Sequence, residues 1–224
     1  AELVDSHTRT VRSCEFSPDG SRLATASFDG TVVVWRLSDS KVFGAGPEWI
    51  EEVRLDGHEN EVKAVAWNAA GTLLATCGRD KSVWVWDVPS SSSSPGAAAA
   101  APAAAAAADL ASDDEDDEDE DDFEERRPAL PATTSSSWEC AAVLTGHGGD
   151  VKFVTFHPTE DLLASASYDD TIRLWARDAA VQDWVCVGTL TGHENTVWGL
   201  TFAGPDALVS CSQDLSLRVW ARGS

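Results

Sequence analysis

The sequence lacks the features that would place the chain in a membrane or on a nucleic acid. It contains no run of eighteen apolar residues, so no membrane-spanning helix is expected. No signal peptide is visible, and basic residues are scarce, with 16 lysines and arginines against 38 acidic residues. The net charge of −22 argues against a nucleic-acid partner, because binding to phosphates needs a basic surface.

Cysteine is also sparse, and its spacing does not suit a metal centre. The five cysteines are Cys14, Cys77, Cys140, Cys186 and Cys211, and no two of them form a Cys-x-x-Cys pair. Zinc and iron–sulfur sites usually have ligands at closer spacing. We therefore expect no metal ligands and no cofactor, and we interpret the cysteines as small buried side chains in a reducing compartment.

One set of four residue types, in contrast, recurs four times at the same spacing. An aspartate follows each histidine after 22 residues (21 in the last set), a hydroxyl residue stands four residues before that aspartate, and a tryptophan stands six residues after it. The sets are His7, Thr25, Asp29 and Trp35; His58, Thr76, Asp80 and Trp86; His147, Ser165, Asp169 and Trp175; and His193, Ser210, Asp214 and Trp220. A period of this kind indicates a repeat architecture.

Each repeat also has the pattern of short antiparallel strands. β-Branched and aromatic runs such as Thr171–Trp175 (TIRLW) are bounded by turn sequences such as Ser17–Gly20 (SPDG). In that turn proline presets φ at one central position, and glycine accepts a positive φ. With the run before the next histidine, for example residues 49–55 (WIEEVRL), each repeat has about four strands. This pattern predicts an all-β fold built from the blades of a β-propeller.

The recurring residues allow two interpretations. Serine, histidine and aspartate could form a hydrolase triad, but an enzyme needs one nucleophile, whereas this set occurs four times. The alternative is a buried hydrogen-bonded network within each blade, since buried polar groups must be paired and a paired network fixes one packing. We favour the network, and we expect no catalytic residues and no enzyme activity.

The count of strands predicts an incomplete propeller. We expect three full blades and one three-stranded blade, with residues 1–5 as the outer strand of a preceding blade and only four residues after Trp220. Closed propellers typically have four to eight blades, and the absence of methionine leaves no initiator. We therefore expect the blades to occupy residues 1–88 and 138–224 of a chain that is itself incomplete.

A long insertion interrupts the blades between residues 89 and 137. It combines serine and alanine runs with an acidic block, Asp109–Glu125, which holds 13 of the 38 acidic residues. Such a block cannot bury enough apolar surface to offset its ordering entropy, so we expect a disordered loop. It falls between the third and fourth strands of one blade, and we interpret it as a loop insertion, with a docking site for a basic partner as the alternative.

Longer stretches of the repeats resemble one family closely. Residues 55–67 (LDGHENEVKAVAW), 73–88, 162–175 and 183–202 are similar to the WD40 subunit of the cytosolic iron–sulfur protein assembly (targeting) complex. The resemblance covers the chain outside residues 89–137 and implies the middle blades, about four of seven, of a WD40 propeller. It also implies that each set of four residues is the hydrogen-bonded tetrad of this family.

The resemblance further implies a function and a set of partners. It implies a non-catalytic scaffold that works with a MIP18-type adaptor, a HEAT-repeat targeting subunit, a hydrogenase-like iron–sulfur carrier and client apoproteins. The expected location is the cytoplasm, with the nucleus as a second compartment. The alternative function is a generic WD40 protein-interaction scaffold in another complex, for example in chromatin or ubiquitin ligation, because the fold alone does not give a function.

The positions beside the tetrads predict where a partner binds. A valine stands four residues after each tetrad histidine, at Val11, Val62, Val151 and Val197. In a propeller, the residue before each tetrad aspartate and the residue after each of these valines emerge on the same face. The candidates that we expect to bind partners there are Arg12, Phe28, Lys63, Arg79, Lys152, Tyr168 and Trp198, and Gln213 occupies the equivalent position in the last repeat. Arginine, tyrosine and tryptophan dominate binding hot spots, so this face is predicted to receive an acidic or carboxylate-bearing peptide.

Overall fold

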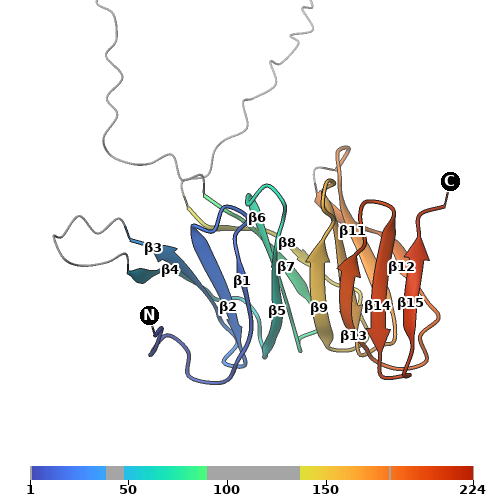
Figure 1. Ribbon diagram of the computed structural model, residues 1–224, viewed down its shortest axis with the longest axis horizontal. Helices are drawn as coiled ribbons and strands as arrows, with labels where there is room; N and C mark the ends of the chain where they lie inside the picture. Colours follow the sequence, from blue (N-terminus) through green and yellow to red (C-terminus); the bar gives the residue numbers. More distant parts are fainter. Residues whose placement is uncertain (1, 39–47, 90–136, 182, 224) are drawn as a thin grey trace, which may run out of the picture. The chain divides into compact units, whose positions relative to one another are not determined.

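The computed structural model describes residues 2–38, 48–89, 137–181 and 183–223. Within these residues fifteen strands form four antiparallel sheets, and each sheet follows the order of the chain. Figure 1 shows the sheets one after another from the N-terminus to the C-terminus. The prediction of an all-β fold with three four-stranded blades and one three-stranded blade is confirmed for this part of the chain.

The sheets are numbered here in chain order. The first contains β1 (Val11–Phe16), β2 (Arg22–Ser27), β3 (Val32–Leu37) and β4 (Trp49–Leu55). The second contains β5 (Val62–Trp67), β6 (Leu73–Gly78), β7 (Val83–Asp87) and β8 (Glu139–Leu144). The third contains β9 (Val151–Phe156), β10 (Leu162–Ser167), β11 (Ile172–Asp178) and β12 (Asp183–Leu190), and the fourth contains β13 (Val197–Phe202), β14 (Ala207–Ser212) and β15 (Leu217–Ala221).

Two kinds of tight turn join the strands at opposite ends of each sheet. At one end, Ser17–Gly20 closes with a hydrogen bond from the Gly20 N–H to the Ser17 carbonyl, and Gly20 has a φ of 70°. At the other end, the residue after each tetrad aspartate has a positive φ. Gly30 fills this position in the first sheet, whereas Lys81, Asp170 and Leu215 adopt it in the others, at the cost that a side chain incurs there.

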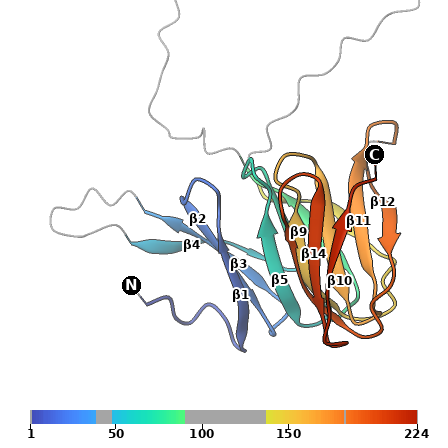
Figure 2. The same cartoon turned by 45° about the vertical axis from the view of Figure 1, so that its right-hand side comes forward.

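The hydrophobic core lies between neighbouring sheets. One cluster joins the first and second sheets and includes Val34, Trp67 and Trp86. A second joins the second and third sheets, and a third joins the third and fourth. Figure 2 shows the inner strands β1, β5 and β9 on adjacent sheets. Small buried residues such as Ala24 and Ala75 let neighbouring sheets approach closely.

The acidic insertion connects two strands that pair directly. β7 pairs with β8 from Val83 opposite Leu144 to Asp87 opposite Glu139. The predicted disorder of residues 89–137 concerns a segment that lies almost entirely outside the described residues. Its two ends are nevertheless held from the first sheet, because Arg22 donates to the Pro89 carbonyl (3.4 Å) and stacks over the Trp138 ring (5.9 Å).

Residues 2–5 lie outside the strands of the four sheets, and a preceding blade is not among the described residues, so their assignment as its outer strand stays a prediction. The expectation that the cysteines are buried was wrong for four of the five. Only Cys77 among the five cysteines is buried. Cys140 and Cys186 are on the outer strands β8 and β12, and the remaining two are on the first and last sheets, so their side chains reach solvent.

No helix among the described residues is long and apolar enough to cross a membrane.

Candidate functional site

The four repeated sets come together as hydrogen-bonded tetrads, one in each sheet. The His Nδ1 atom lies 2.7–3.0 Å from an aspartate oxygen, and the His Nε2 atom lies 2.7–2.9 Å from the hydroxyl oxygen. The tryptophan Nε1–H donates to the same hydroxyl over 2.8–3.2 Å. Each set therefore links the loop before the first strand to the second and third strands of its sheet.

The direction of the hydrogen bonds fixes the protonation of the histidine. In the third sheet Trp175 donates to Ser165, which leaves the Ser165 hydroxyl proton for His147 Nε2. His147 Nδ1–H then donates to Asp169. Burial lowers the pKa of His147, and the neighbouring Asp169 only partly opposes this shift. The ring is therefore neutral at pH 7, with its proton on Nδ1.

A fifth polar position, which the repeat count overlooked, completes each network. The residue two positions after each aspartate donates both its N–H and its hydroxyl to the second carboxylate oxygen, with hydroxyl distances of 2.6–2.7 Å. These residues are Thr31, Ser82, Thr171 and Ser216. The signal was present in the sequence, because every repeat carries a serine or threonine at this spacing. Each aspartate thus accepts from the histidine and from its own turn.

The aspartates are held ionised by these donors. Burial opposes ionisation of Asp169, but hydrogen bonds from Thr171, from the Gly148 N–H and from His147 outweigh it and lower its pKa to about 2. The pKa of Asp80 is also lowered, because hydrogen bonds from His58 and Ser82 overcome the effect of burial. The same balance lowers the pKa of Asp29 and of Asp214.

The lowered pKa values predict a loss of stability in acid. A carboxylate whose pKa is depressed in the folded state stabilises the fold above its unfolded pKa, near 3.8, and loses this contribution as the pH falls through the folded value. Urea unfolding should therefore show the free energy of unfolding falling between about pH 4 and pH 2. Asp169 should account for about 2 kcal/mol, since one pKa unit corresponds to about 1.4 kcal/mol. In an Asp169→Asn variant that part of the slope should vanish, and an unchanged slope would contradict the assignment.

The candidate partner residues lie at the ends of the sheets where the tetrad turns are. We call Arg12, Phe28, Lys63, Arg79, Lys152, Tyr168 and Trp198 the basic–aromatic patch. Lys63 Nζ lies 4.3 Å from the centre of the Phe28 ring, which belongs to the neighbouring sheet. Lys152 Nζ lies 5.3 Å from both the Tyr168 and the Trp198 rings. Cation–π contacts thus link the first sheet to the second and the third to the fourth.

The Lys63 ammonium is influenced by several charged side chains on this face. Burial is the main reason why the pKa of Lys63 is lowered, and the positive charges of Lys152 and Arg79 add to it. Glu61 and Asp150 act in the opposite direction. Cations whose fields overlap in this way act together on an anionic ligand.

Acidic side chains within this face were not predicted. Glu61 forms ion pairs with Arg79 (3.4 Å) and Arg9 (3.5 Å), and Asp150 pairs with Lys152 (3.0 Å). Arg9 was also missed, although its side chain is as exposed as that of Arg79. The face is therefore a mixed-charge surface with partly neutralised cations. Beside Phe28, a polar pocket of about 180 Å³ includes Arg9 and Glu61.

Two candidate residues stand apart from this cluster. Arg12 is exposed at a bulge in β1, and the contacts within the described chain do not join it to the other patch residues. Gln213 is exposed beside the fourth tetrad, and its backbone N–H donates to the Thr196 carbonyl. The residues that the structure brings together are thus Phe28 with Lys63, and Lys152 with Tyr168 and Trp198.

Comparison with known proteins follows the same repeats. The family model described as "WD domain, G-beta repeat" matches residues 2–36, 50–87, 138–176 and 184–221. A solved structure described as "Structure of U3-55K" is similar with a TM-score of 0.66 and 18% sequence identity, over 99% of this chain and 51% of that one. This structural similarity shows the fold alone.

Several similar curated proteins carry the name "Probable cytosolic iron-sulfur protein assembly protein 1". The protein from Neurospora crassa is 37% identical, over 98% of this chain and 52% of its own length. Those from Vanderwaltozyma polyspora and Candida glabrata are 41% and 43% identical, over 98% and 96% of this chain and 69% and 66% of their own lengths. The chain spans about half the length of the first of these relatives. It belongs to the WD40-repeat family and, within it, to the family of cytosolic iron–sulfur protein assembly protein 1.

Proposed function

We propose that this chain is a non-catalytic scaffold of the cytosolic iron–sulfur protein assembly machinery, and that the basic–aromatic patch binds its partners. The observation that supports the binding site is the contact of Lys63 with the half-buried Phe28 ring and of Lys152 with the exposed Tyr168 and Trp198 rings, at the same end of the sheets as the exposed Arg79. Membership of the family supports the pathway. The acidic remainder of the chain makes this cationic group distinctive.

The geometry of the tetrads supports a scaffold rather than a hydrolase. The hydroxyl groups of Thr76 and Ser165 belong to side chains that are 0% exposed, and each accepts an indole N–H. A nucleophile must reach the substrate from a position beside its base. A buried hydroxyl whose lone pair is already engaged cannot do so, and the same arrangement in every sheet is what a structural network requires.

The patch supports recognition of an acidic or carboxylate-bearing peptide. Arg79 is exposed and can form two parallel hydrogen bonds with a carboxylate, after exchanging its contact with Glu61. Tyr168 and Trp198 are exposed beside Lys152, so apolar contact area and positive charge lie together. Interfaces usually depend on a few arginine, tyrosine and tryptophan residues of this kind.

The proposed partners are an adaptor of the MIP18 type, a HEAT-repeat targeting subunit, a hydrogenase-like cluster carrier and client apoproteins in the cytosol. Purification of the tagged chain from cells should recover these subunits. Recovery of histones or of ubiquitin ligase subunits in their place would overturn the assignment to iron–sulfur assembly and favour a scaffold in another complex.

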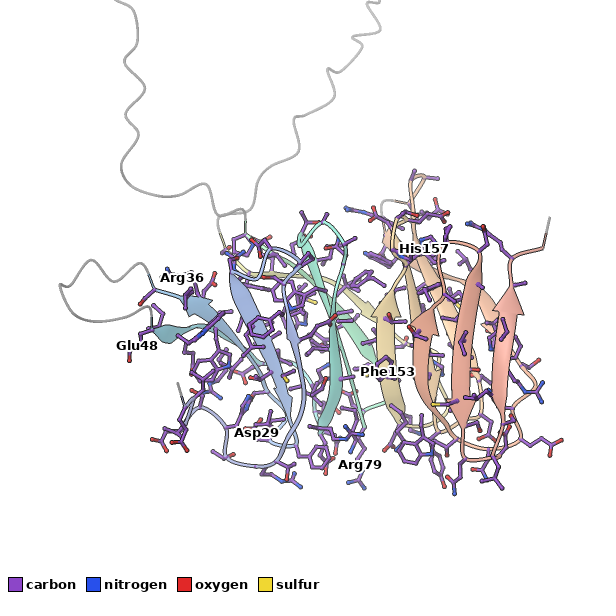
Figure 3. The ribbon with its side chains drawn as sticks, in the orientation of Figure 1. Asp29, Arg36, Glu48, Arg79, Phe153 and His157 are labelled. Atoms are coloured by element: carbon purple, nitrogen blue, oxygen red, sulfur yellow. The ribbon has the colours of Figure 1, made fainter. Side chains whose placement is uncertain are left out.

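Charge reversal at Arg79 should weaken binding of peptides from iron–sulfur client proteins by about tenfold or more. A charge-assisted hydrogen bond contributes about 1.5–3 kcal/mol, and 1.4 kcal/mol corresponds to a factor of ten. Arg79→Glu would be compared with Arg36→Glu, which makes the same change of charge at the opposite end of the sheets (Figure 3). Fluorescence anisotropy at two salt concentrations measures the affinity, which should fall as the salt rises.

The Arg36→Glu variant should bind the peptides as tightly as the unmodified chain. Equal weakening in both variants would indicate a non-specific effect of the net charge. Unchanged binding by a folded Arg79→Glu chain would remove Arg79 from the proposed site.

A further inference from the structure

Two arginines from neighbouring sheets meet one carboxylate at the end of the sheets where the tetrad turns are. Arg9 lies in the loop before β1 of the first sheet, Arg79 follows β6 of the second sheet, and Glu61 directly precedes β5. The Glu61 Oε1 atom accepts from Arg9 Nη2 over 3.5 Å and from Arg79 Nη1 over 3.4 Å. Its Oε2 atom also accepts from Arg79 Nη1 over 3.4 Å. One carboxylate thus occupies a site made by two guanidinium groups.

The position of Glu61 recurs in every sheet, but its contact with two sheets does not. Its counterparts in the other sheets are Thr10, Asp150 and Thr196, whose carbonyls accept the same backbone hydrogen bond as the Glu61 carbonyl. The Asp150 carboxylate pairs with Lys152 of its own sheet. Within the described residues, Glu61 alone of this set holds cations from two sheets. The arrangement is therefore a local feature of the boundary between the first and second sheets and not a requirement of the repeat.

The contacts of Glu61 are long for charged groups. A guanidinium and a carboxylate normally approach to about 2.7–2.9 Å, and Arg22 and Glu52 do so at 2.9 Å. The Arg9 and Arg79 side chains are 57% and 58% exposed, whereas that of Glu61 is 13% exposed. A guanidinium group carries several N–H donors, and Arg79 uses only its Nη1 atom for Glu61. Both arginines can therefore bind a second carboxylate that approaches from solvent.

Arg9 is held in place by a further contact. Its Nη1 atom donates to the Phe28 carbonyl over 2.7 Å, in the turn beside the first tetrad. The polar pocket of about 180 Å³ beside Phe28 has Arg9, Glu61 and Asp29 in its wall. Figure 3 shows Asp29 and Arg79 at the same end of the sheets. A group that enters this pocket therefore meets both Arg9 and Glu61.

Glu61 is ionised at neutral pH. A hydrogen bond from its own backbone N–H lowers its pKa against the effect of burial, and the positive charges of Arg79 and Lys63 lower it further. An ionised carboxylate in this place competes with any other anion for the same donors.

We propose that Arg9 and Arg79 together bind an acidic side chain of a partner protein, and that Glu61 is an internal competitor which the partner's carboxylate replaces. This inference rests on the proposed role of the basic–aromatic patch, to which it adds Arg9 as a binding residue and Glu61 as a residue that sets specificity. Because binding exchanges one carboxylate for another, an isolated acidic group gains little. A ligand must gain from further contacts with the patch, and Glu61 thereby rejects anions that lack them.

The Glu61→Gln variant should bind an acidic probe about threefold to tenfold more tightly than the unmodified chain, because two exposed ion pairs of modest strength are released. The probe is fluorescein-labelled tetraglutamate, with tetraglutamine as the uncharged control, and fluorescence anisotropy gives the affinities for the 224-residue chain. The variant's affinity for tetraglutamate should also be more sensitive to salt, because binding no longer replaces one ion pair by another. Equal affinity of the variant and the unmodified chain, or no binding of tetraglutamate to either, would overturn the proposal.

Glu194→Gln is the matched control for this substitution. Glu194 is exposed at the same end of the sheets, where its backbone N–H donates to Asp214, and it forms no ion pair within the described residues. The same change of net charge there should leave the affinity for tetraglutamate almost unchanged. An equal gain in the Glu194→Gln and Glu61→Gln variants would show a general effect of charge and would also overturn the proposal.

Variants of the two arginines test whether the gain belongs to this site. Arg9→Gln should weaken binding of tetraglutamate about threefold, whereas Arg36→Gln, at the opposite end of the sheets, should not. In a chain that carries Arg9→Gln and Arg79→Gln, the further change Glu61→Gln should add nothing, because residues in contact have non-additive effects. A gain that persists in this chain would contradict the exchange. A Glu61→Gln chain that loses stability in urea without a change in affinity would show that Glu61 only joins the two sheets.

Peptides from iron–sulfur client proteins separate this inference from the proposed function. If they fail to bind while tetraglutamate responds to Glu61→Gln, the carboxylate site is supported and the proposed function fails. If they bind through Arg79 but neither they nor tetraglutamate respond to Glu61→Gln, the proposed function is supported and the role of Glu61 is overturned.

Discussion

An Asp80→Ala variant should lose about 3–5 kcal/mol of its free energy of unfolding. Asp80 accepts hydrogen bonds from His58 (2.7 Å), from the Glu59 N–H (3.2 Å) and from Ser82 (2.7 Å). The His58 side chain is only 2% exposed, so removal of the carboxylate leaves its Nδ1–H without a partner and away from water. Breaking a buried pair by removing one member costs this amount, because the remaining polar group keeps its desolvation penalty.

Asp56→Ala is the matched control for this experiment. Asp56 is exposed and stands two residues before His58, so the same substitution should change stability by less than about 0.5 kcal/mol. Urea denaturation of both variants gives the two free energies and shows through the slope whether unfolding stays cooperative. A loss below about 1 kcal/mol in Asp80→Ala would contradict the view that the tetrads hold the sheets together.

A Trp175→Ala variant should be destabilised by about 3–5 kcal/mol. The Trp175 side chain is 3% exposed, donates to Ser165 over 2.8 Å and belongs to the cluster between the second and third sheets. Its removal opens a cavity in a close-packed core and leaves the surrounding side chains without contacts. The loss is measured by the same urea unfolding experiment, followed by circular dichroism rather than by intrinsic tryptophan fluorescence.

Trp198→Ala provides the contrast, since its side chain is 47% exposed on the basic–aromatic patch. We expect it to cost less than about 1 kcal/mol in stability while it weakens peptide binding at the patch, because Lys152 loses one of its two aromatic contacts. Equal destabilisation by the two tryptophan variants would indicate that Trp198 is structural, and would count against its assignment to a binding surface.

The tetrads were predictable from the sequence because their geometry depends on local spacing. A constant number of residues between His58, Thr76 and Asp80 places the same atoms in register once the strands pair. The charge pairs on the patch were not predictable in this way. Whether Glu61 meets Arg79 or Arg9 depends on side-chain conformations and on the approach of neighbouring sheets, which no spacing encodes.

Exposure of individual residues was the least predictable property. Alternation along β8 and β12 shows which residues share a face, but it does not show which face is covered by another sheet. Cys140 and Cys186 were therefore expected inside and are exposed. A pocket of about 200 Å³ between the third and fourth sheets depends in the same way on how these sheets approach, because Leu162 and Leu190 of the third sheet and Phe202 of the fourth line it.

Arg22 holds the residues at both ends of the connection between β7 and β8, which makes this connection a suitable place for protein engineering. Arg22 is fixed by a two-point contact with Glu52 (2.9 and 3.1 Å) and holds both Pro89 and Trp138. The gap between these two anchors is set by the scaffold, and doubling the length of a flexible loop costs only about 0.6 kcal/mol. A fluorescent reporter or an affinity handle grafted between residues 89 and 138 would leave the surface around Arg79, at the far end of the sheets, free for use.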